Sequence, residues 1–243
     1  MSVSARETAP FYEFSMVEGA IRLAVAGADL CLRASGALWL ARERTLVAAD
    51  LHLEKGSAFA ARGQLLPPYD TRDTLRRLAE EVLRLHPRTV VLLGDAFHDA
   101  WAEERLAAED AEAIHALGSG RSLVWVVGNH DPQPPKGLPG ESIAAFELAG
   151  VSFRHEPSGV PAYGEAAGHL HPCARIAAGG RSVRYRCFVT DGERLILPAF
   201  GAYAGGLSIR DLAFKGLFVR PPLAVALGPR RAHAIGWWSV RPD

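Results

Sequence analysis

Three apolar stretches that each end in Asp, His or Asn constrain the fold more than any other feature of this chain. They are LVAADLH (46–52), VVLLGD (90–95) and VWVVGNHD (124–131). Near-continuous apolar runs of this kind are typical of strands that are buried on both faces of a parallel sheet. Polar residues at the carboxyl ends of such strands lie where open α/β sheets bind ligands. The sequence therefore predicts an α/β fold with a site at one sheet edge.

The segments between and after these strands complete the α/β pattern. Residues 36–52 predict a hairpin that turns around Arg42 to Arg44. A helix is expected over 69–87, with Asp70 as its cap and Pro87 as its stop, and a second helix over 102–118, closed by Gly118. The apolar stripe of the first helix is Leu75, Leu78, Val82 and Leu85. Strands are expected at 174–178, 182–190 and 194–200, with a hairpin turn at Asp191 and Gly192.

Composition excludes several classes of protein. The 243 residues carry 27 basic and 27 acidic side chains, so no global field draws the chain to nucleic acid or lipid. The three cysteines have no CxxC spacing, which argues against zinc knuckles and a disulfide framework. Residues 1–14 hold no apolar core of signal-peptide length, and no run is long enough to span a membrane. We expect one cytoplasmic domain over residues 1–243.

The polar residues at the strand ends have the chemistry of metal ligands. Gly94 and Gly128 precede them and let the backbone turn without crowding a site. DLH (50–52) and HLH (169–171) place two side chains on one face if the strand geometry persists. Oxygen and imidazole donors without thiolate suit manganese, iron or zinc. Six or seven donors are too many for one ion, so two metals about 3.5–4 Å apart that share a carboxylate are expected.

At this point the chain resembles the calcineurin-like metallophosphoesterases. Five blocks occur in the family's order, namely DLH at 50, GDAFH at 94, GNHD at 128, RHEP at 154 and GHLHP at 168. The combination of five blocks between residues 50 and 171 is far more specific than DLH alone. The resemblance implies a four-layer αββα sandwich, in which helices flank two mixed β-sheets.

The resemblance also implies a role for each motif residue. Asp50, His52, Asp95 and His171 would hold one metal, and Asp95, Asn129, His155 and His169 the other, with Asp95 as the bridge. His130 would contact the phosphate and protonate the leaving oxygen, Asp131 would orient His130, and His98 would lie near the phosphate. Mn²⁺ is favoured, with iron, zinc or nickel as alternatives, and a metal-bridged hydroxide would attack the phosphorus. His86, His115 and His233 match no block, and no residue is assigned to substrate binding.

Longer stretches resemble one subfamily, the ligase-associated DNA damage response phosphodiesterases. They are ADLHLEKGSAFAARGQLLPPYDTRDTL, GNHDPQPPKGL, FRHEP and LILPAFGAYAGGL, within about residues 36–210. This resemblance implies a manganese-dependent endonuclease that acts on DNA in repair, in functional association with a DNA ligase, a helicase and an exonuclease. Protein phosphatases differ, because they carry Asp-Arg-Gly after the second block, where this chain reads HDAWAEE.

Two alternatives to a DNA enzyme stay open at this point. Neutral net charge counts against non-specific DNA binding, which depends on phosphate neutralisation by Lys and Arg. A hydrolase of a small phosphodiester, such as a cyclic nucleotide, needs no such surface. A scaffold subunit without activity is the third class, although a complete ligand set argues against it. A DNA-binding stripe, if there is one, would come from Arg62, Arg72, Arg76, Arg154, Arg175, Arg181, Arg184 and Arg186.

Overall fold

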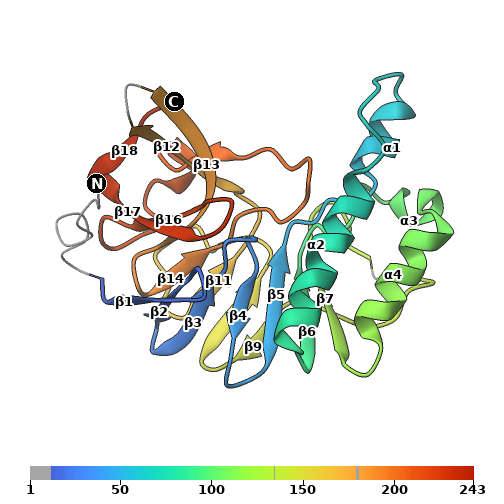
Figure 1. Cartoon of the computed structure of the whole chain (residues 1–243), viewed down its shortest axis with the longest axis horizontal. Coiled ribbons are helices and arrows are strands. Elements are labelled where there is room, and N and C mark those ends of the chain that lie inside the picture. Colours follow the sequence, from blue (N-terminus) through green and yellow to red (C-terminus); the bar gives the residue numbers. More distant parts are fainter. Residues whose placement is uncertain (1–11, 134, 179–180) are drawn as a thin grey trace.

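The structure is a computed structural model that describes residues 12–133, 135–178 and 181–243. Of the N-terminal residues considered for a signal peptide, 1–11 lie outside the described part. Two mixed sheets stack face to face, and the helices α1–α4 gather at one side of the molecule (Figure 1). The predicted α/β sandwich of two mixed sheets is confirmed. None of the described helices is both long and apolar enough to cross a membrane.

The first sheet contains the three strands that the apolar runs predicted. Its strands in spatial order are β1 (Phe14–Val17), β2 (Ala20–Val25), β3 (Ala28–Leu32), β4 (Leu38–Leu40), β5 (Thr45–Ala49), β6 (Thr89–Leu93), β7 (Ser122–Val126) and β8 (Glu141–Ile143). The strands from β1 to β5 pair antiparallel, and those from β5 to β8 pair parallel. The hairpin predicted at 36–52 is the β4–β5 pair.

Alternation along the parallel strands explains why they are apolar throughout. In β6, Val91 and Leu93 belong to the core between the two sheets, whereas Val90 and Leu92 pack against the helices. The same division separates Val124 and Val126 from Leu123 and Trp125 in β7. Because successive side chains of a strand point to opposite faces, a strand between two cores needs an apolar residue at every position.

The second sheet is built from the remainder of the chain. Its strands are β9 (Phe146–Leu148), β10 (Val151–Arg154), β11 (Glu165–Ala167), β12 (Pro172–Ala178), β13 (Arg181–Thr190), β14 (Arg194–Ile196), β15 (Leu207–Ser208), β16 (Leu223–Leu227), β17 (Ala232–Gly236) and β18 (Val240–Arg241). Strands β10, β11 and β14 run parallel, and β13 and β14 form the hairpin predicted around Asp191 and Gly192. Gly192 has the positive φ, 84°, that this turn needs.

The helices α2 (Asp70–Leu85), α3 (Ala102–Arg105) and α4 (Ala108–Gly118) cover the free face of the first sheet, and α1 (Lys55–Ala60) lies against α2 and α3. Leu75, Leu78 and Val82 of α2 are buried there as predicted. Asp70 does not cap its own helix, because the N-cap position is Tyr69 and makes no side-chain cap bond. Instead the Gly56 N–H donates to Asp70 Oδ2 at 2.9 Å, which ties α1 to α2.

The helix predicted over 102–118 is broken into α3 and α4. Leu106 and Ala107 have extended backbone, with ψ values of 127° and 146°. The break lets Leu106 pack against the core under the helices. It also leaves Arg105 free to pair with Asp99 at 2.9 Å. A tertiary requirement thus overrides a sequence that contains no Gly or Pro at this point.

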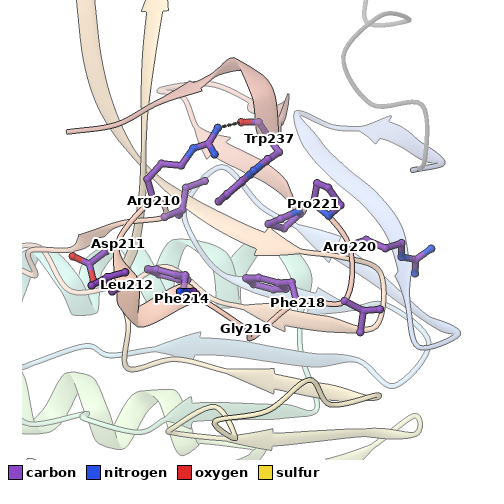
Figure 2. A pocket seen from close by; sticks show the side chains of 13 residues that line it. Arg210, Asp211, Leu212, Phe214, Gly216, Phe218, Arg220, Pro221 and Trp237 are labelled. Carbon is purple, nitrogen blue, oxygen red and sulfur yellow. Dashed lines mark hydrogen bonds between the residues drawn. The ribbon is translucent and has the colours of Figure 1, made fainter.

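The outer face of the second sheet is covered differently from the outer face of the first. Among the described residues, its cover includes the 3₁₀ helices η1 (Leu212–Phe214) and η2 (Trp237–Ser239), with no α-helix. Phe214 and Leu217 pack on this face, beside a cavity of about 430 Å³ (Figure 2). The Arg210 guanidinium stacks on the Trp237 ring, 3.8 Å from its centroid, and donates to the Trp237 carbonyl.

Candidate metal centre

The predicted site residues follow the carboxyl ends of parallel strands in both sheets. Asp50 and His52 follow β5, Asp95 follows β6, and Asn129 follows β7. The register pairs Ala49 with Leu93, and Leu93 with Val126, so these strands end side by side. In the second sheet, His155 follows β10, and His169 and His171 follow β11. The site therefore lies where the edges of the two stacked sheets meet.

A first group of donor atoms comes from Asp50, His52 and His171. One donor atom from each lies within 4.8 Å of the others. The Nε2 atoms of His52 and His171 are 3.2 Å apart, and His171 Nε2 lies 3.4 Å from Asp50 Oδ1. Imidazole nitrogens and a carboxylate oxygen thus converge on one small volume.

A second group comes from Asp95, His155 and His169, again with donor atoms within 4.8 Å of one another. His155 Nε2 lies 2.7 Å from Asn129 Oδ1, 3.1 Å from His169 Nδ1 and 3.4 Å from Asp95 Oδ1. His169 and His171, neighbours in the sequence, therefore contribute to different groups.

The Asp95 carboxylate lies between the two groups. Its Oδ1 faces His155, whereas its Oδ2 lies 3.9 Å from His52 Nε2. Asp95 is buried, with 2% of its surface exposed, and Oδ1 also accepts a hydrogen bond from the His130 N–H at 2.9 Å. A carboxylate with one oxygen toward each group has the arrangement that a shared ligand of two ions needs.

Left-handed backbone at five of these residues aims the side chains inward. Asp50, His52, Asp95, His169 and His171 have φ values of 52°, 45°, 43°, 68° and 45°. The strand geometry considered for DLH and HLH does not persist, because β5 ends at Ala49 and β11 at Ala167. Non-glycine residues at positive φ store strain and cluster at functional sites.

The glycines before the motif residues make room for the site. Gly94 has a φ of 68°, and a Cβ there would lie 2.1 Å from His155 Nδ1. A Cβ on Gly128 would lie 2.2 Å from Asp95 Oδ1. Close approach of backbone to ligand side chains therefore requires glycine at both positions, as the sequence indicated.

Burial lowers the pKa values of the His52 and His155 imidazoles, which lie beside the Asp50 and Asp95 carboxylates. Desolvation, followed by the neighbouring His171, lowers the pKa of His52 to about 2, and desolvation also lowers the pKa of His155. Among the described residues, no Lys or Arg pairs with Asp50 or Asp95, and only histidines lie at ion-pair distance. Neutral imidazole is the form that binds metal.

The donor chemistry fits divalent cations. Carboxylate, amide and imidazole donors converge, and the three cysteines Cys31, Cys173 and Cys187 are buried and free, none of them in either group. Two buried carboxylates, exposed by 0% and 2%, carry negative charge that cations would compensate. These side chains could hold two ions that share Asp95.

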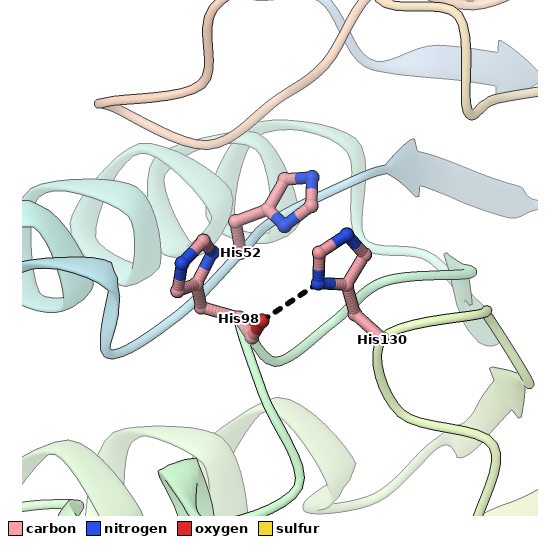
Figure 3. Close-up of side chains that lie close together, drawn as sticks. All are labelled: His52, His98 and His130. Atoms are coloured by element: carbon pink, nitrogen blue, oxygen red, sulfur yellow. Dashed lines mark hydrogen bonds between the residues drawn. The ribbon is translucent and has the colours of Figure 1, made fainter. Parts of the chain in front are cut away.

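Two further histidines, His98 and His130, lie with His52 of the first group on one side of the site (Figure 3). The His98 and His130 rings stack at 5.7 Å, and His52 lies 5.8 Å from His98 and 5.3 Å from His130. His130 Nδ1 lies 2.8 Å from the His98 carbonyl oxygen. Burial is the largest cause of a lowered pKa at His98, and the Lys55 cation is the next.

Asp131 does not orient His130, contrary to the role that the resemblance implies. Its Oδ2 accepts the Phe97 N–H and its Oδ1 the Gly128 N–H, both at 3.1 Å. Burial raises the pKa of this carboxyl to about 7. Asp131 therefore braces the turns after β6 and β7, and the His98 carbonyl takes the position beside His130 Nδ1.

The arginines considered for a stripe are mostly engaged elsewhere. Arg72, Arg76, Arg154, Arg175 and Arg184 pair with acidic side chains. Arg186 points inward and donates to four backbone carbonyls of residues 199–204 at 2.8–3.2 Å. Of the eight, Arg62 is the one whose charge contributes to the lowered pKa of His98.

Sequence reasoning missed Lys55 and Phe59, which lie next to His98. Their helical spacing of four was visible, but only the packing of α1 shows what they face. The three histidines that match no family block lie outside the site. His86 follows the end of α2, His115 is in α4, and His233 is in β17.

The pattern of the calcineurin-like phosphoesterase family matches residues 43–193, more than half of the chain. The chain belongs to the calcineurin-like phosphoesterase family. It is therefore a metal-dependent phosphoesterase. The match begins just before β5 and includes every residue of the two donor groups.

Two solved structures are similar to this chain. Pseudomonas putida nuclease MPE, known from a crystal structure, is 25% identical in sequence to this chain. The two structures match with a TM-score of 0.68 over 91% of this chain and 100% of that one. Yfce, a phosphoesterase from E. coli, is 15% identical, with a TM-score of 0.41, over 79% of this chain and 98% of that one. No curated protein matches the sequence.

Proposed function

We propose that the protein is a binuclear phosphodiesterase that cleaves nucleic acid. The observation that carries the proposal is the Asp95 carboxylate, whose two oxygens face two separate donor groups. In this proposal Asp50, His52, Asp95 and His171 hold one ion, and Asp95, Asn129, His155 and His169 hold the other. Two bound divalent cations would lower the pKa of a coordinated water and neutralise charge on the phosphoryl oxygens.

His130 is the proposed proton donor to the leaving oxygen. A carbonyl oxygen only accepts hydrogen bonds, so the contact with His98 places the imidazole proton on His130 Nδ1. The other nitrogen, Nε2, faces the site, 3.9 Å from Asp95 Oδ2. A proton taken up at Nε2 would be held at the position from which it passes to a leaving alkoxide.

Nucleic acid is the proposed substrate, and DNA in a repair setting the specific form of it. The similarity to a nuclease over nearly the whole chain supports this substrate, as does the resemblance of four sequence stretches to the ligase-associated phosphodiesterases. In the same proposal the metal is Mn²⁺, the protein acts in the cytoplasm, and its functional partners are a DNA ligase, a helicase and an exonuclease.

A small phosphodiester, such as a cyclic nucleotide, is the second candidate substrate. The pairing of Arg72, Arg76, Arg175 and Arg184 with acidic side chains favours it, because long polyanions gain affinity from many uncompensated cations. The two substrates differ in length, and a substrate panel separates them.

The test of the proposed function is hydrolysis by the Mn²⁺-loaded protein. We expect faster cleavage of bis-p-nitrophenyl phosphate than of the monoester, and cleavage of a DNA oligonucleotide in preference to cyclic nucleotides. A preference for the monoester would refute the phosphodiesterase. Cleavage of cyclic nucleotides alone would refute the nucleic-acid substrate but retain the diesterase chemistry.

A further inference from the structure

One face of α1 presents a cation and an aromatic ring beside the three histidines. Lys55 and Phe59 are four residues apart and so share a helix face, with the Lys55 Nζ 5.8 Å from the centre of the Phe59 ring. The Phe59 ring lies 5.9 Å from the His98 ring, which in turn stacks on His130. A row of rings therefore runs outward from His130 to Phe59. Lys55 and Phe59, together with Arg62 in the turn that follows α1, are called the α1 face below.

The α1 face is held in a fixed position by its neighbours. A helix of six residues is not stable by itself. Here the Gly56 N–H donates to Asp70 at 2.9 Å, and Thr71 Oγ1 donates to Glu54 Oε1 at 2.8 Å. On the other side Arg105 donates to Ser57 Oγ at 3.0 Å. Bonds to both α2 and α3 therefore fix where Lys55 and Phe59 point.

The cations of the α1 face differ in their pairing from two arginines of α2. Arg72 and Arg76, on the next helix, pair with Glu109 and Glu80 at 2.7 and 2.6 Å. Within the part of the chain that the structure describes, no carboxylate pairs with Lys55 or Arg62. Both are close enough to His98 to contribute to its lowered pKa. Unpaired positive charge next to the site is available to an anion.

We propose that the α1 face binds the nucleotide that adjoins the scissile phosphate. Phe59 stacks against its nucleoside, and Lys55 and Arg62 bind the next phosphate along the strand. This inference rests on the proposed function, because a flanking nucleotide exists only in a nucleic-acid or nucleotide diester. Aromatic stacking accepts every base, and ammonium binds phosphate as a point charge, so the contact is strong without sequence preference. A neutral protein would in this way hold a polyanion locally.

The test compares two substrates in two variants. Phe59→Leu removes the ring and keeps apolar volume, and Lys55→Met removes the charge and keeps the stem. The matched controls are Trp238→Leu, at an exposed aromatic residue, and Lys215→Met, at the outer cavity of the second sheet. The quantity is the ratio of kcat/KM for a DNA oligonucleotide to that for methyl p-nitrophenyl phosphate, a diester without a nucleoside.

We expect Phe59→Leu to lower this ratio about tenfold, through KM for the oligonucleotide, and Phe59→Trp to keep it. Lys55→Met should lower the ratio roughly fivefold. It should also reduce the slope of log kcat/KM against log salt concentration by about one, the value for one phosphate contact. A purely structural role of Lys55 would leave that slope unchanged. The controls should match the wild type.

Wild-type ratios and salt slopes in both variants would overturn the inference while the proposed function stands. Wild-type protein that hydrolyses the small diester but no oligonucleotide would refute the nucleic-acid substrate, and the inference with it. Hydrolysis of neither substrate would refute the phosphodiesterase itself. Metal content and thermal midpoint, measured for every variant, identify any loss that comes from misfolding.

Discussion

Two clusters of buried ionisable side chains differ in how their charges are compensated. In the second sheet, Arg194, Glu165 and Asp191 are exposed by 0%, 4% and 1%. At the edge where the sheets meet, Asp50, Asp95 and His155 are just as buried, at 0%, 2% and 5%. Burial alone therefore does not distinguish a structural cluster from a candidate active site.

The cluster around Arg194 is satisfied by the protein itself. Arg194 Nε lies 2.9 Å from Glu165 Oε1, and the guanidinium donates to the carbonyls of Leu217 and Val160 at 2.8 and 2.6 Å. Asp191 accepts the N–H groups of Glu193, Arg194 and Val219. Every charge there has an opposite charge or several hydrogen bonds. Such a cluster stabilises one arrangement of loops and has no need of a ligand.

The carboxylates of the cluster around Asp95 have no Lys or Arg partner among the described residues, although Asp50 and Asp95 each accept a backbone N–H. At ion-pair distance they meet the imidazoles of His52 and His155, whose pKa values burial lowers. Because an uncompensated buried charge is costly, this cluster is stable only with help from elsewhere. The difference shows that unsatisfied charge, more than burial, indicates where cations would bind.

The largest effect is expected at the shared carboxylate. Asp95→Asn should lower kcat by about 10⁴-fold, because both ions lose a charged ligand and with it several kcal/mol of charge stabilisation. The same variant should raise the thermal midpoint of the metal-free protein, since a buried charge is removed. Metal content by mass spectrometry and melting with and without EDTA would check both effects. An active variant that retains two ions would contradict the bridging assignment.

His130→Ala should leave both ions bound and lower kcat by roughly 10²–10⁴-fold, since only the proton donor is lost. The loss should grow as the leaving group becomes more basic, which a series of substituted aryl diesters would measure. If the variant instead loses metal, His130 is a ligand and not an acid.

Arg194→Met should destabilise the protein by about 3–5 kcal/mol, because it leaves the Glu165 charge buried and unpaired. The double variant with Glu165→Gln should regain part of this free energy of unfolding. Denaturant titration with and without Mn²⁺ gives the measurement. If the loss in free energy of unfolding changed with Mn²⁺, the two clusters would be coupled and the Arg194 cluster would not be purely structural.

The smallest expected effect concerns the binding of different ions by His169 and His171. His171→Ala should weaken one ion and His169→Ala the other, each by at least roughly tenfold, since the two side chains belong to different donor groups. Calorimetric titration of the metal-free variants with Mn²⁺ would resolve the two sites. Equal weakening of both ions in both variants would place the pair on a single ion.

Local features that the sequence shows directly include the strands β5, β6 and β7 and their polar ends. An apolar residue at every position requires burial on both faces, whatever the partners are. Gly94 and Gly128 were also recognisable from the sequence, because backbone that turns beside a ligand side chain leaves no room for a Cβ. The order of the five blocks was enough to indicate the family.

Other features depended on partners far away in the sequence. The helix break at Leu106 depends on packing against another element. Asp70 accepts a hydrogen bond from Gly56, and Asp131 accepts hydrogen bonds from Phe97 and Gly128. The condition on DLH and HLH, that strand geometry persists, is not met, because the chain enters left-handed backbone at four of these positions. Asp and His adopt left-handed backbone more readily than most residues, but the surrounding packing is what holds all four of them in it.

The sequence by itself determined which strands are buried, which donor types gather at their ends and which family the chain resembles, because strand periodicity and ligand chemistry are properties of short segments. The tertiary structure decided which side chains of α1 lie beside His98 and which arginines pair with acidic side chains. Those choices follow from long-range contacts, whose energies depend on which elements pack together and not on the residues alone.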